Sequence, residues 1–347
     1  MVYGLWSGKV DIWTKVKHTL KQKHIPIEVI LELTKRCNLK CCHCYNIKDS
    51  CQLSFKQVKI IFKQLRDAGT LFLVLTGGEV FLHPDIMEIL NLAKNMNFNL
   101  KIFTNGTLIT EEIARNLAKI MPSEIGISIQ GARAKTHDLI TGVKGSYEKS
   151  IQAIKILKAK SISVNLKTTL MQQNFSEFKE IIKLAADLGI VYIMDPVIAP
   201  RDDGSCDVLA YRLTDAQLEE FYQFEVELKG YIYEPEEKEY FCQAGFTFGS
   251  ISANGDVYPC IQLPHKLGNI FEQDFSGIWQ NAEFLKKMRR SNAYDNPECQ
   301  SCKIADVCTR CPGLAFLEDG DAFGKSAVAC MHAQVYKKLG DRVKGEG

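Results

Sequence analysis

The sequence has no apolar segment long enough to cross a membrane and no strong excess of charge of either sign. Its 347 residues include 43 Lys and Arg against 41 Asp and Glu, a formal net charge of +2. Because basic and acidic residues are interleaved, the charge pattern does not favour a nucleic-acid partner. Residues 1–30 mix apolar residues with Lys and His, unlike a signal peptide. We therefore expect a cytosolic protein that binds neither membranes nor nucleic acid.

Cysteine, in contrast, is abundant and unevenly placed. Of 13 cysteines, five lie within residues 37–51, seven lie within residues 242–330, and only Cys206 lies between the two groups. A reducing cytosol disfavours a framework of disulfides. Structural thiols would also be scattered through the apolar segments. The clustering therefore predicts metal sites in two parts of the chain.

Short apolar segments alternate with amphipathic ones between the two cysteine groups. Segments rich in Ile, Val, Leu and Phe, typical of strands buried on both faces, lie at 27–33, 71–75, 100–103, 125–129, 164–168 and 191–194. Helical spacing of apolar residues is found at 55–68, 85–95, 111–120, 147–160, 175–188 and 215–229. Six β–α units predict an α/β fold with a parallel sheet, either open and doubly wound or a partial barrel.

The regular alternation stops near residue 231, where Gly and Cys become frequent. The pair Asn254-Gly255 between 248–252 and 257–258 predicts a hairpin, and 275–289 predicts one helix. Apolar residues are sparse here, so we expect bound metal to supply part of the folding free energy. The predicted organisation is an N-terminal extension over 1–24, an α/β region over 25–231 and a cysteine-rich region over 232–347.

The first cysteine group contains Cys37, Cys41 and Cys44, which follow the first predicted strand at spacings of four and three. Three thiolates spaced in this way can bind three irons of a [4Fe–4S] cluster and leave the fourth iron open. An open iron can accept a bidentate ligand such as the amino and carboxyl groups of methionine. The alternative is a zinc site, which usually has four ligands and would recruit His43 or Cys42.

Polar and glycine-rich motifs also follow the next three predicted strands. They are Thr76-Gly77-Gly78-Glu79, Thr104-Asn105-Gly106 and Ser128-Ile129-Gln130-Gly131. Glycines allow the backbone to approach a ligand, and a carboxylate suits an ammonium group. With the cysteine motif, all lie at the carboxyl ends of consecutive strands, where parallel α/β folds place their sites. A zinc protein does not need this arrangement.

On these motifs the chain resembles the radical S-adenosylmethionine (radical SAM) superfamily. The resemblance implies a partial (β/α)6 barrel with a SAM-binding [4Fe–4S] cluster on Cys37, Cys41 and Cys44. It also implies cofactor contacts from the following residues: His43, Tyr45, Gly77, Gly78, Glu79, Asn105, Ser128 and Lys167. Gln130 stands where relatives often carry Asp.

The second cysteine group resembles the SPASM extension of peptide-modifying radical enzymes, which holds two auxiliary clusters. The resemblance assigns Cys299, Cys302, Cys308 and Cys330 to a distal cluster, and Cys242, Cys260 and Cys311 to a nearer one. Two residues separate Cys308 from Cys311 where the common pattern has three, and no eighth cysteine lies just before Cys242. The nearer cluster therefore has an open iron, a non-cysteine ligand or Cys206 as its fourth ligand. Two zinc ribbons are the alternative, although seven cysteines fit two four-ligand sites poorly.

Cys206 lies in the polar loop 201–206 after the sixth predicted strand. It is a candidate hydrogen donor to a substrate radical, a candidate cluster ligand or an inert thiol. Cys42 and Cys51 are interpreted as bystanders. His137 and Asp138 are adjacent on a predicted helix and so point apart. Ile261 stands where sulfatase-maturing relatives carry Asp, which weakens an interpretation of this chain as a sulfatase-maturing enzyme.

The resemblance implies an enzyme that cleaves SAM reductively to a 5′-deoxyadenosyl radical. Its implied substrate is a ribosomally synthesised peptide, modified by a C–S or C–C cross-link or by epimerisation. An electron donor such as flavodoxin or ferredoxin is also expected. Because 36 residues before Cys37 are too few for a leader-binding domain, a separate leader-recognition protein is predicted. The alternatives are oxidation of a small molecule in haem or quinone cofactor biosynthesis, and a non-enzymatic metal-binding or electron-transfer scaffold.

Overall fold

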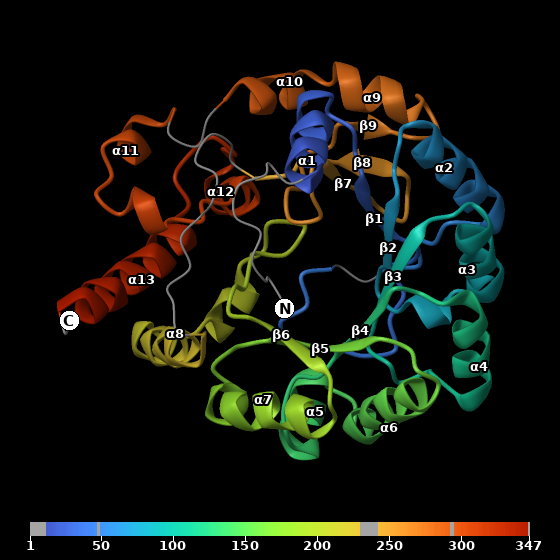
Figure 1. The fold of residues 1–347 in the computed structure, drawn as a ribbon, viewed down its shortest axis with the longest axis horizontal. Helices are drawn as coiled ribbons and strands as arrows, with labels where there is room; N and C mark the ends of the chain where they lie inside the picture. Colours follow the sequence, from blue (N-terminus) through green and yellow to red (C-terminus); the bar gives the residue numbers. More distant parts are fainter. Residues whose placement is uncertain (1–11, 47–48, 230–241, 292–294, 346–347) are drawn as a thin grey trace.

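The computed structural model describes residues 12–46, 49–229, 242–291 and 295–345, built on one nine-stranded sheet (Figure 1). The strand order is β6-β5-β4-β3-β2-β1-β7-β8-β9. The six strands expected from the sequence are β1 Glu28–Glu32, β2 Phe72–Thr76, β3 Asn99–Thr104, β4 Glu124–Ser128, β5 Val164–Thr169 and β6 Val191–Asp195. They are parallel, with β6 at one open edge, so the sheet does not close.

Helices cover the outer face of this sheet (Figure 1). They are α2 Phe55–Asp67, α3 Ile86–Asn95, α4 Glu111–Ile120, α5 Ala134–Thr141, α6 Ser146–Ala159 and α7 Phe178–Asp187. Alternate strand residues such as Val29, Leu31 and Ile127 pack with them in one apolar core. A doubly wound sheet would carry helices on both faces, so this arrangement confirms the partial barrel.

The opposite, concave face of the sheet carries polar side chains. Residues alternate across a strand, so Glu28, Ile30 and Glu32 of β1 share the face that Val29 and Leu31 do not. The register brings Ser128 of β4 beside Lys167 of β5, and Thr169 beside Asp195. Charged groups therefore line the inside of the partial barrel near the carboxyl ends of its strands.

The cysteine-rich region adds strands to the same sheet. Strand β7 Phe248–Ile251 pairs in parallel with β1, and its hairpin with β8 Asp256–Tyr258 confirms the turn predicted at Asn254-Gly255. Strand β9 Gly268–Asn269 pairs with β8. Instead of one helix over 275–289 the structure has α9 Phe275–Asn281 and α10 Glu283–Arg290. Ala282 is extended between them, which turns α10 so that Leu285 and Met288 become buried.

The C-terminal helices pack back on the barrel. Helix α8 Asp215–Lys229 follows β6, and α13 Ala327–Gly345 lies against it (Figure 1). Tyr222 of α8 and Val335 of α13 share an apolar cluster with Phe178 of α7. Short helices α11 Pro297–Gln300 and α12 Pro312–Asp319 precede α13. The region thus contacts the sheet at β1 and the barrel wall beside β6.

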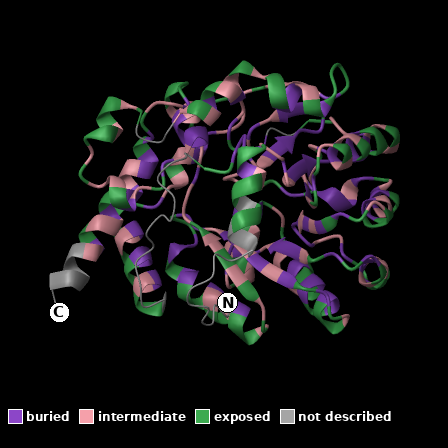
Figure 2. Ribbon diagram, turned by 45° about the horizontal axis from the view of Figure 1, so that its top comes forward, coloured by how far each residue is buried: buried purple, intermediate pink, exposed green. Residues whose placement is uncertain are grey.

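The N-terminal helix α1 Ile12–Gln22 ends near the cysteine-rich region, where the Trp279 indole donates to the His24 carbonyl (2.8 Å). The domain boundary predicted at 231/232 lies outside the described residues. Among the described helices, none is long and apolar enough to cross a membrane. Figure 2 shows buried residues along the strands and exposed ones on the outer helices.

Candidate active site at the carboxyl end of the barrel

Two glycines hold the first cysteine loop against strand β2. The Gly78 amide donates to the Thr34 carbonyl (2.7 Å), and the Glu79 amide donates to the Arg36 carbonyl (2.8 Å). A Cβ on Gly77 would stand 2.3 Å from the Thr34 oxygen, and one on Gly78 would stand 2.2 Å from the Arg36 oxygen. Only glycine allows this approach. In the protein alone, these glycines position the segment that leads into Cys37.

The Glu79 carboxylate is fully buried and bonded to groups of the protein. It accepts hydrogen bonds from the Thr104 hydroxyl (2.6 Å), the Asn105 amide (2.7 Å) and the Phe81 amide (3.1 Å). Burial raises the pKa of Glu79, and these three donors oppose the rise. The carboxylate therefore ties the loop after β2 to the loop after β3. Its role as a ligand of the methionine ammonium stays a prediction.

Asn105 extends this network to the cysteine loop. Its side-chain amide donates to the Asn38 side-chain Oδ1 (2.9 Å) and lies 4.0 Å from the Cys37 Sγ. Its backbone carbonyl accepts from Ser150 (2.7 Å). The predicted residues Cys37, Glu79 and Asn105 are thus brought together at one edge of the sheet.

Ser128 and Lys167 lie on the concave face, farther along the sheet. The Lys167 Nζ is 3.4 Å from the centre of the Phe103 ring, a cation–π contact. A Cβ on Gly126 would stand within 3 Å of the Lys167 and Phe103 side chains, so the absence of a side chain at Gly126 gives these two side chains space to pack. Burial lowers the pKa of Lys167, while Glu124 and Asp195 oppose this. Lys167 is a partly buried cation inside the barrel, and its cofactor contact stays a prediction.

Gln130 links the ends of β4 and β5. Its side-chain oxygen accepts from the Thr169 amide (3.1 Å), and its own amide donates to His137 Nδ1 (3.1 Å). Asn174 donates to its carbonyl (3.1 Å). These contacts are structural. They account for Gln at a position where relatives often carry Asp.

Arg201, which sequence reasoning did not single out, connects the cysteine loop to the loop after β6. Its guanidinium donates to the Cys44 carbonyl (2.5 Å) and pairs with Asp207 at 2.8 and 2.9 Å. The Asp202 amide also donates to the Tyr45 carbonyl (3.1 Å). The signal that could have found it is the charge pattern Arg201-Asp202-Asp203 beside the loop of Cys206.

The other residues of the cysteine motif lie beside the loop after β6 that carries Arg201. Burial and the Arg201 charge lower the pKa of His43 to about 4, so its ring is neutral. Burial and the negative charges of Glu32, Asp202, Cys44 and Cys260 raise the pKa of Tyr45 well above its ordinary value. Cys42 packs with Ile140, Met171, Ile198 and Val208, which agrees with its reading as a bystander. Tyr45 therefore lies near both cysteine groups.

Cys206 is exposed, and its Sγ lies 3.5 Å from the Gly204 carbonyl. The structure places it on the Arg201 loop at the active-site end of the barrel. Its roles as hydrogen donor or ligand stay predictions.

The C-terminal cysteines influence one another's charge in two groups, and their assignment to two clusters stays a prediction. Burial, and then the charges of Cys330, Cys299 and Cys302, raise the pKa of Cys308 to about 11. Burial, with Cys311 and Cys260 nearby, raises the pKa of Cys242 to about 12, and that of Cys260 rises to about 11. Such thiols need a bound cation to become thiolates.

The donor chemistry of these sets fits iron–sulfur clusters. Across the described ranges, no three Cys, His, Asp or Glu side chains converge on one metal ion. A four-iron cube holds its thiolate ligands on separate corners, which suits sets made of cysteine alone. Individual ligand assignments stay predictions.

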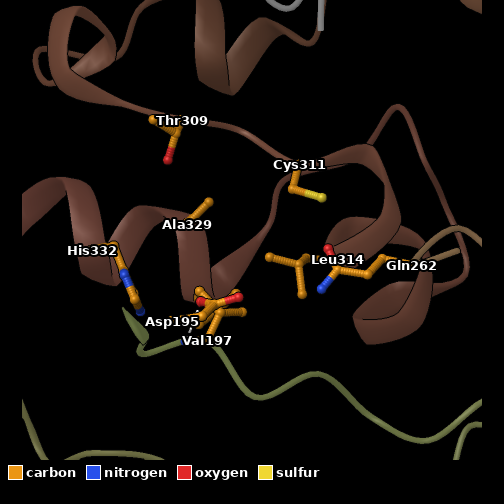
Figure 3. Close-up of a pocket in the computed structure, with 9 residues that line it drawn as sticks. Asp195, Val197, Gln262, Thr309, Cys311, Leu314, Ala329 and His332 are labelled. Carbon is orange, nitrogen blue, oxygen red and sulfur yellow. Dashed lines mark hydrogen bonds between the residues drawn. The ribbon is translucent and has the colours of Figure 1, made fainter. Parts of the chain in front are cut away.

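A cavity of about 180 Å³ lies between the end of β6 and the cysteine-rich region (Figure 3). Asp195 and Val197 line it from the barrel, and Cys311 and His332 line it from the opposite side. The His332 Nδ1 is bonded to the Tyr222 hydroxyl (2.5 Å). The cavity thus gives access to one of the predicted ligands of the nearer cluster.

Matches to known proteins show the family. Residues 31–185 match the radical SAM superfamily, and residues 242–303 match the SPASM iron–sulfur cluster-binding domain. The AdoMet-dependent heme synthase of Methanosarcina barkeri is 30% identical over 330 residues, covering 85% of this chain and 94% of the relative. The antilisterial bacteriocin subtilosin biosynthesis protein AlbA of Bacillus subtilis is 31% identical over 83% of this chain and 67% of its own length. Streptococcus suis SuiB bound to precursor peptide SuiA has a TM-score of 0.71 at 19% identity, over 95% of this chain and 84% of that chain.

The chain therefore belongs to the radical SAM superfamily. Its C-terminal region contains a SPASM domain, and the two domains together imply [4Fe–4S] clusters and SAM binding. The resemblance drawn from the motifs is confirmed. The matched SPASM segment includes Cys242, Cys260, Cys299 and Cys302, and ends before Cys308.

Proposed function

We propose that this chain cleaves SAM with a cluster on Cys37, Cys41 and Cys44. With two auxiliary clusters it then modifies a ribosomally synthesised peptide by a C–S or C–C cross-link or by epimerisation. The observation that carries the proposal is the hydrogen-bonded network that joins the cysteine loop, Glu79 and Asn105 at the carboxyl ends of three strands. It holds three family motifs in one place.

The chain's own residues would bind and orient the cofactor. When bound, the SAM cluster supplies an electron that breaks SAM and yields a 5′-deoxyadenosyl radical. Gly77 and Gly78 hold the cysteine loop, and Glu79 holds the Asn105 loop against it. Lys167 and Ser128 present a cation and a hydroxyl on the concave face. A low-potential donor such as flavodoxin or ferredoxin and a separate leader-recognition protein complete the proposal.

The peptide substrate is supported by relatives. AlbA is named for subtilosin biosynthesis, and SuiB has been crystallised with its precursor peptide. The test is anaerobic reconstitution followed by incubation with candidate precursor peptides. We expect roughly twelve irons, three cubes of four, and reductant-dependent 5′-deoxyadenosine. A loss of two mass units would indicate a cross-link or oxidation, and one deuterium from heavy water would indicate epimerisation. Stoichiometric zinc without SAM cleavage would contradict the proposal.

A second candidate is oxidation of a porphyrin. It is favoured by the heme synthase of Methanosarcina barkeri, of which this chain covers 94%. The two candidates share the SAM cluster and differ only in the substrate. SAM consumption stimulated by an iron porphyrin, and not by peptides, would establish the second candidate in place of the first.

A further inference from the structure

Glu32 is a buried carboxylate at the end of β1, and no family motif includes it. Its side chain is 7% exposed, and its Oε1 atom has no hydrogen-bond partner. The register pairs Glu32 with Thr76, directly before Gly77, and Cys37 follows five residues later in the chain. Glu32 therefore lies beneath both the glycine loop and the cysteine loop, on the concave face of the sheet.

The groups that face Glu32 come from four other parts of the chain. Asp202 follows β6, Lys35 precedes the cysteine motif, Tyr45 follows it and Tyr258 ends β8. Tyr45 is also influenced by Cys44 of the first group and Cys260 of the second. The Glu32 carboxylate is thus placed close to the point where the two predicted cluster sites approach each other.

This arrangement costs folding free energy. A buried carboxylate oxygen that has no hydrogen-bond partner loses its hydration and gains no hydrogen bond in return. Burial, followed by the like charge of Asp202, raises the pKa of Glu32 to about 7, although Lys35 opposes the rise. Residues that destabilise the fold without a local compensation are concentrated at functional sites. The acceptor atom is also open to a donor that the protein alone does not provide.

We propose that Glu32 is the catalytic base that removes a proton from the substrate during its oxidation. This inference rests on the proposed radical function. The substrate first loses one hydrogen atom, which becomes the third hydrogen on the 5′ carbon of 5′-deoxyadenosine. The resulting substrate radical then loses one proton to the Glu32 carboxylate and one electron to an oxidised auxiliary cluster. The substrate has then lost two hydrogens in total, and Glu32 is left protonated.

The first test measures folding stability, because a base that is unpartnered in the resting protein should be a liability to the fold. Glu32→Gln keeps the shape and removes the charge. We expect the Tm of the reconstituted protein to rise by about 5 °C at pH 8, and the difference to shrink towards pH 5, where Glu32 is protonated in the wild type as well. Glu28→Gln is the matched control on the same strand and face, and it should leave the Tm difference near zero at both pH values.

The second test measures chemistry on the substrate, peptide or porphyrin, that loses two mass units with the wild type. We expect Glu32→Gln to form 5′-deoxyadenosine within threefold of the wild-type rate. Product should fall about 100-fold, the contribution typical of a general base. Glu28→Gln should keep both rates. Wild-type amounts of product from Glu32→Gln, or a lower Tm at pH 8 with both rates reduced in parallel, would overturn the inference.

Asp202→Asn provides a second route if Glu32→Gln does not fold. Removing the like charge should lower the pKa of Glu32. The ratio of product to 5′-deoxyadenosine falls as the pH is lowered, and in the variant this fall should occur at a lower pH. A fall at an unchanged pH would count against Glu32 as the base. If the wild type itself forms no 5′-deoxyadenosine, the proposed function fails instead, which separates the two failures.

Discussion

The two cysteine regions are held in place in different ways. The first loop is bonded to the barrel through Gly78, Arg36 and the Glu79–Asn105 network, so its backbone is placed by the protein. Most of the C-terminal thiols lie on loops or on the short helix α11, with Cys330 on the long helix α13, and neighbouring thiols help to raise the pKa values of Cys308 and Cys242. The comparison indicates that the first site is largely preorganised, whereas the C-terminal sites depend on bound iron for their stability.

The largest expected effect comes from breaking the preorganised loop. Gly78→Ala would place a Cβ 2.2 Å from the Arg36 carbonyl, so the cysteine loop must move away from β2. We expect reductant-dependent 5′-deoxyadenosine to fall on the order of 100-fold, with loss of about one cube of iron. Gly320→Ala is the control, since a Cβ at Gly320 would have nothing within 4 Å and would carry only the cost of Ala at φ +76°. An active Gly78→Ala variant would show that the close approach is dispensable.

Removing the metal sharpens the comparison directly. Chelation of the clusters should reduce amide-exchange protection in 242–291 and 295–345 by about tenfold or more relative to β1–β6. The barrel strands should keep their protection because the buried residues of their core are other apolar side chains, with Cys260 only packed against that core. Hydrogen exchange with mass spectrometry checks this. Equal losses in both regions would refute the difference.

Arg201→Gln tests the link between the first cysteine loop and the loop that follows β6. It removes the charged donor to the Cys44 carbonyl and the pair with Asp207. Hydrogen bonds to charged groups contribute about 1.5–3 kcal/mol, so we expect SAM cleavage to fall roughly tenfold. Exchange at residues 42–46 should rise at the same time. Lys183→Gln, which breaks an exposed ion pair on α7, is the control.

The smallest expected effect is a pH dependence of the folding stability of the barrel. Burial lowers the pKa of His137 to about 4, while nearby Asp138 opposes this. As the pH is lowered, His137 therefore takes up a proton in the unfolded state before it does so in the folded state. Its contribution to the free energy of unfolding is fully present above about pH 6.5 and is lost as the pH falls towards 4. Between pH 7.5 and 5.5 we expect His137 to account for a loss of about 1 kcal/mol. His137→Asn, which retains an acceptor for the Gln130 amide, should reduce this slope in denaturant titrations. An unchanged slope would assign the loss to other groups.

The barrel was predictable because its signals are local. Each strand is a short apolar run, and each outer helix repeats apolar residues at its own period. Helix α2 begins at a capping box of Ser54 and Gln57, two residues that are close together in the sequence. The site motifs were predictable for the same reason, since parallel strands place their carboxyl ends together.

The C-terminal region was harder to predict because its order depends on distant contacts. Apolar spacing over 275–289 cannot reveal the change of axis at Ala282. The pairing of β7 with β1 joins segments more than 200 residues apart, as Glu28↔Phe248 shows. Helix α13 was not predicted, and its packing on α8 is a tertiary contact of the same kind.

The sequence by itself determined the α/β fold with a parallel sheet, the two cysteine groups and the resemblance to the radical SAM family, because strand periodicity and motif spacing are local properties. Only the tertiary structure decided that the helices cover one face of the sheet, that Glu79 bonds to Asn105, that Arg201 holds the cysteine loop and that Glu32 has a buried oxygen without a hydrogen-bond partner. Those facts depend on which side chains meet after the strands have paired. Desolvation and hydrogen bonding act across space, and no spacing along the chain encodes them.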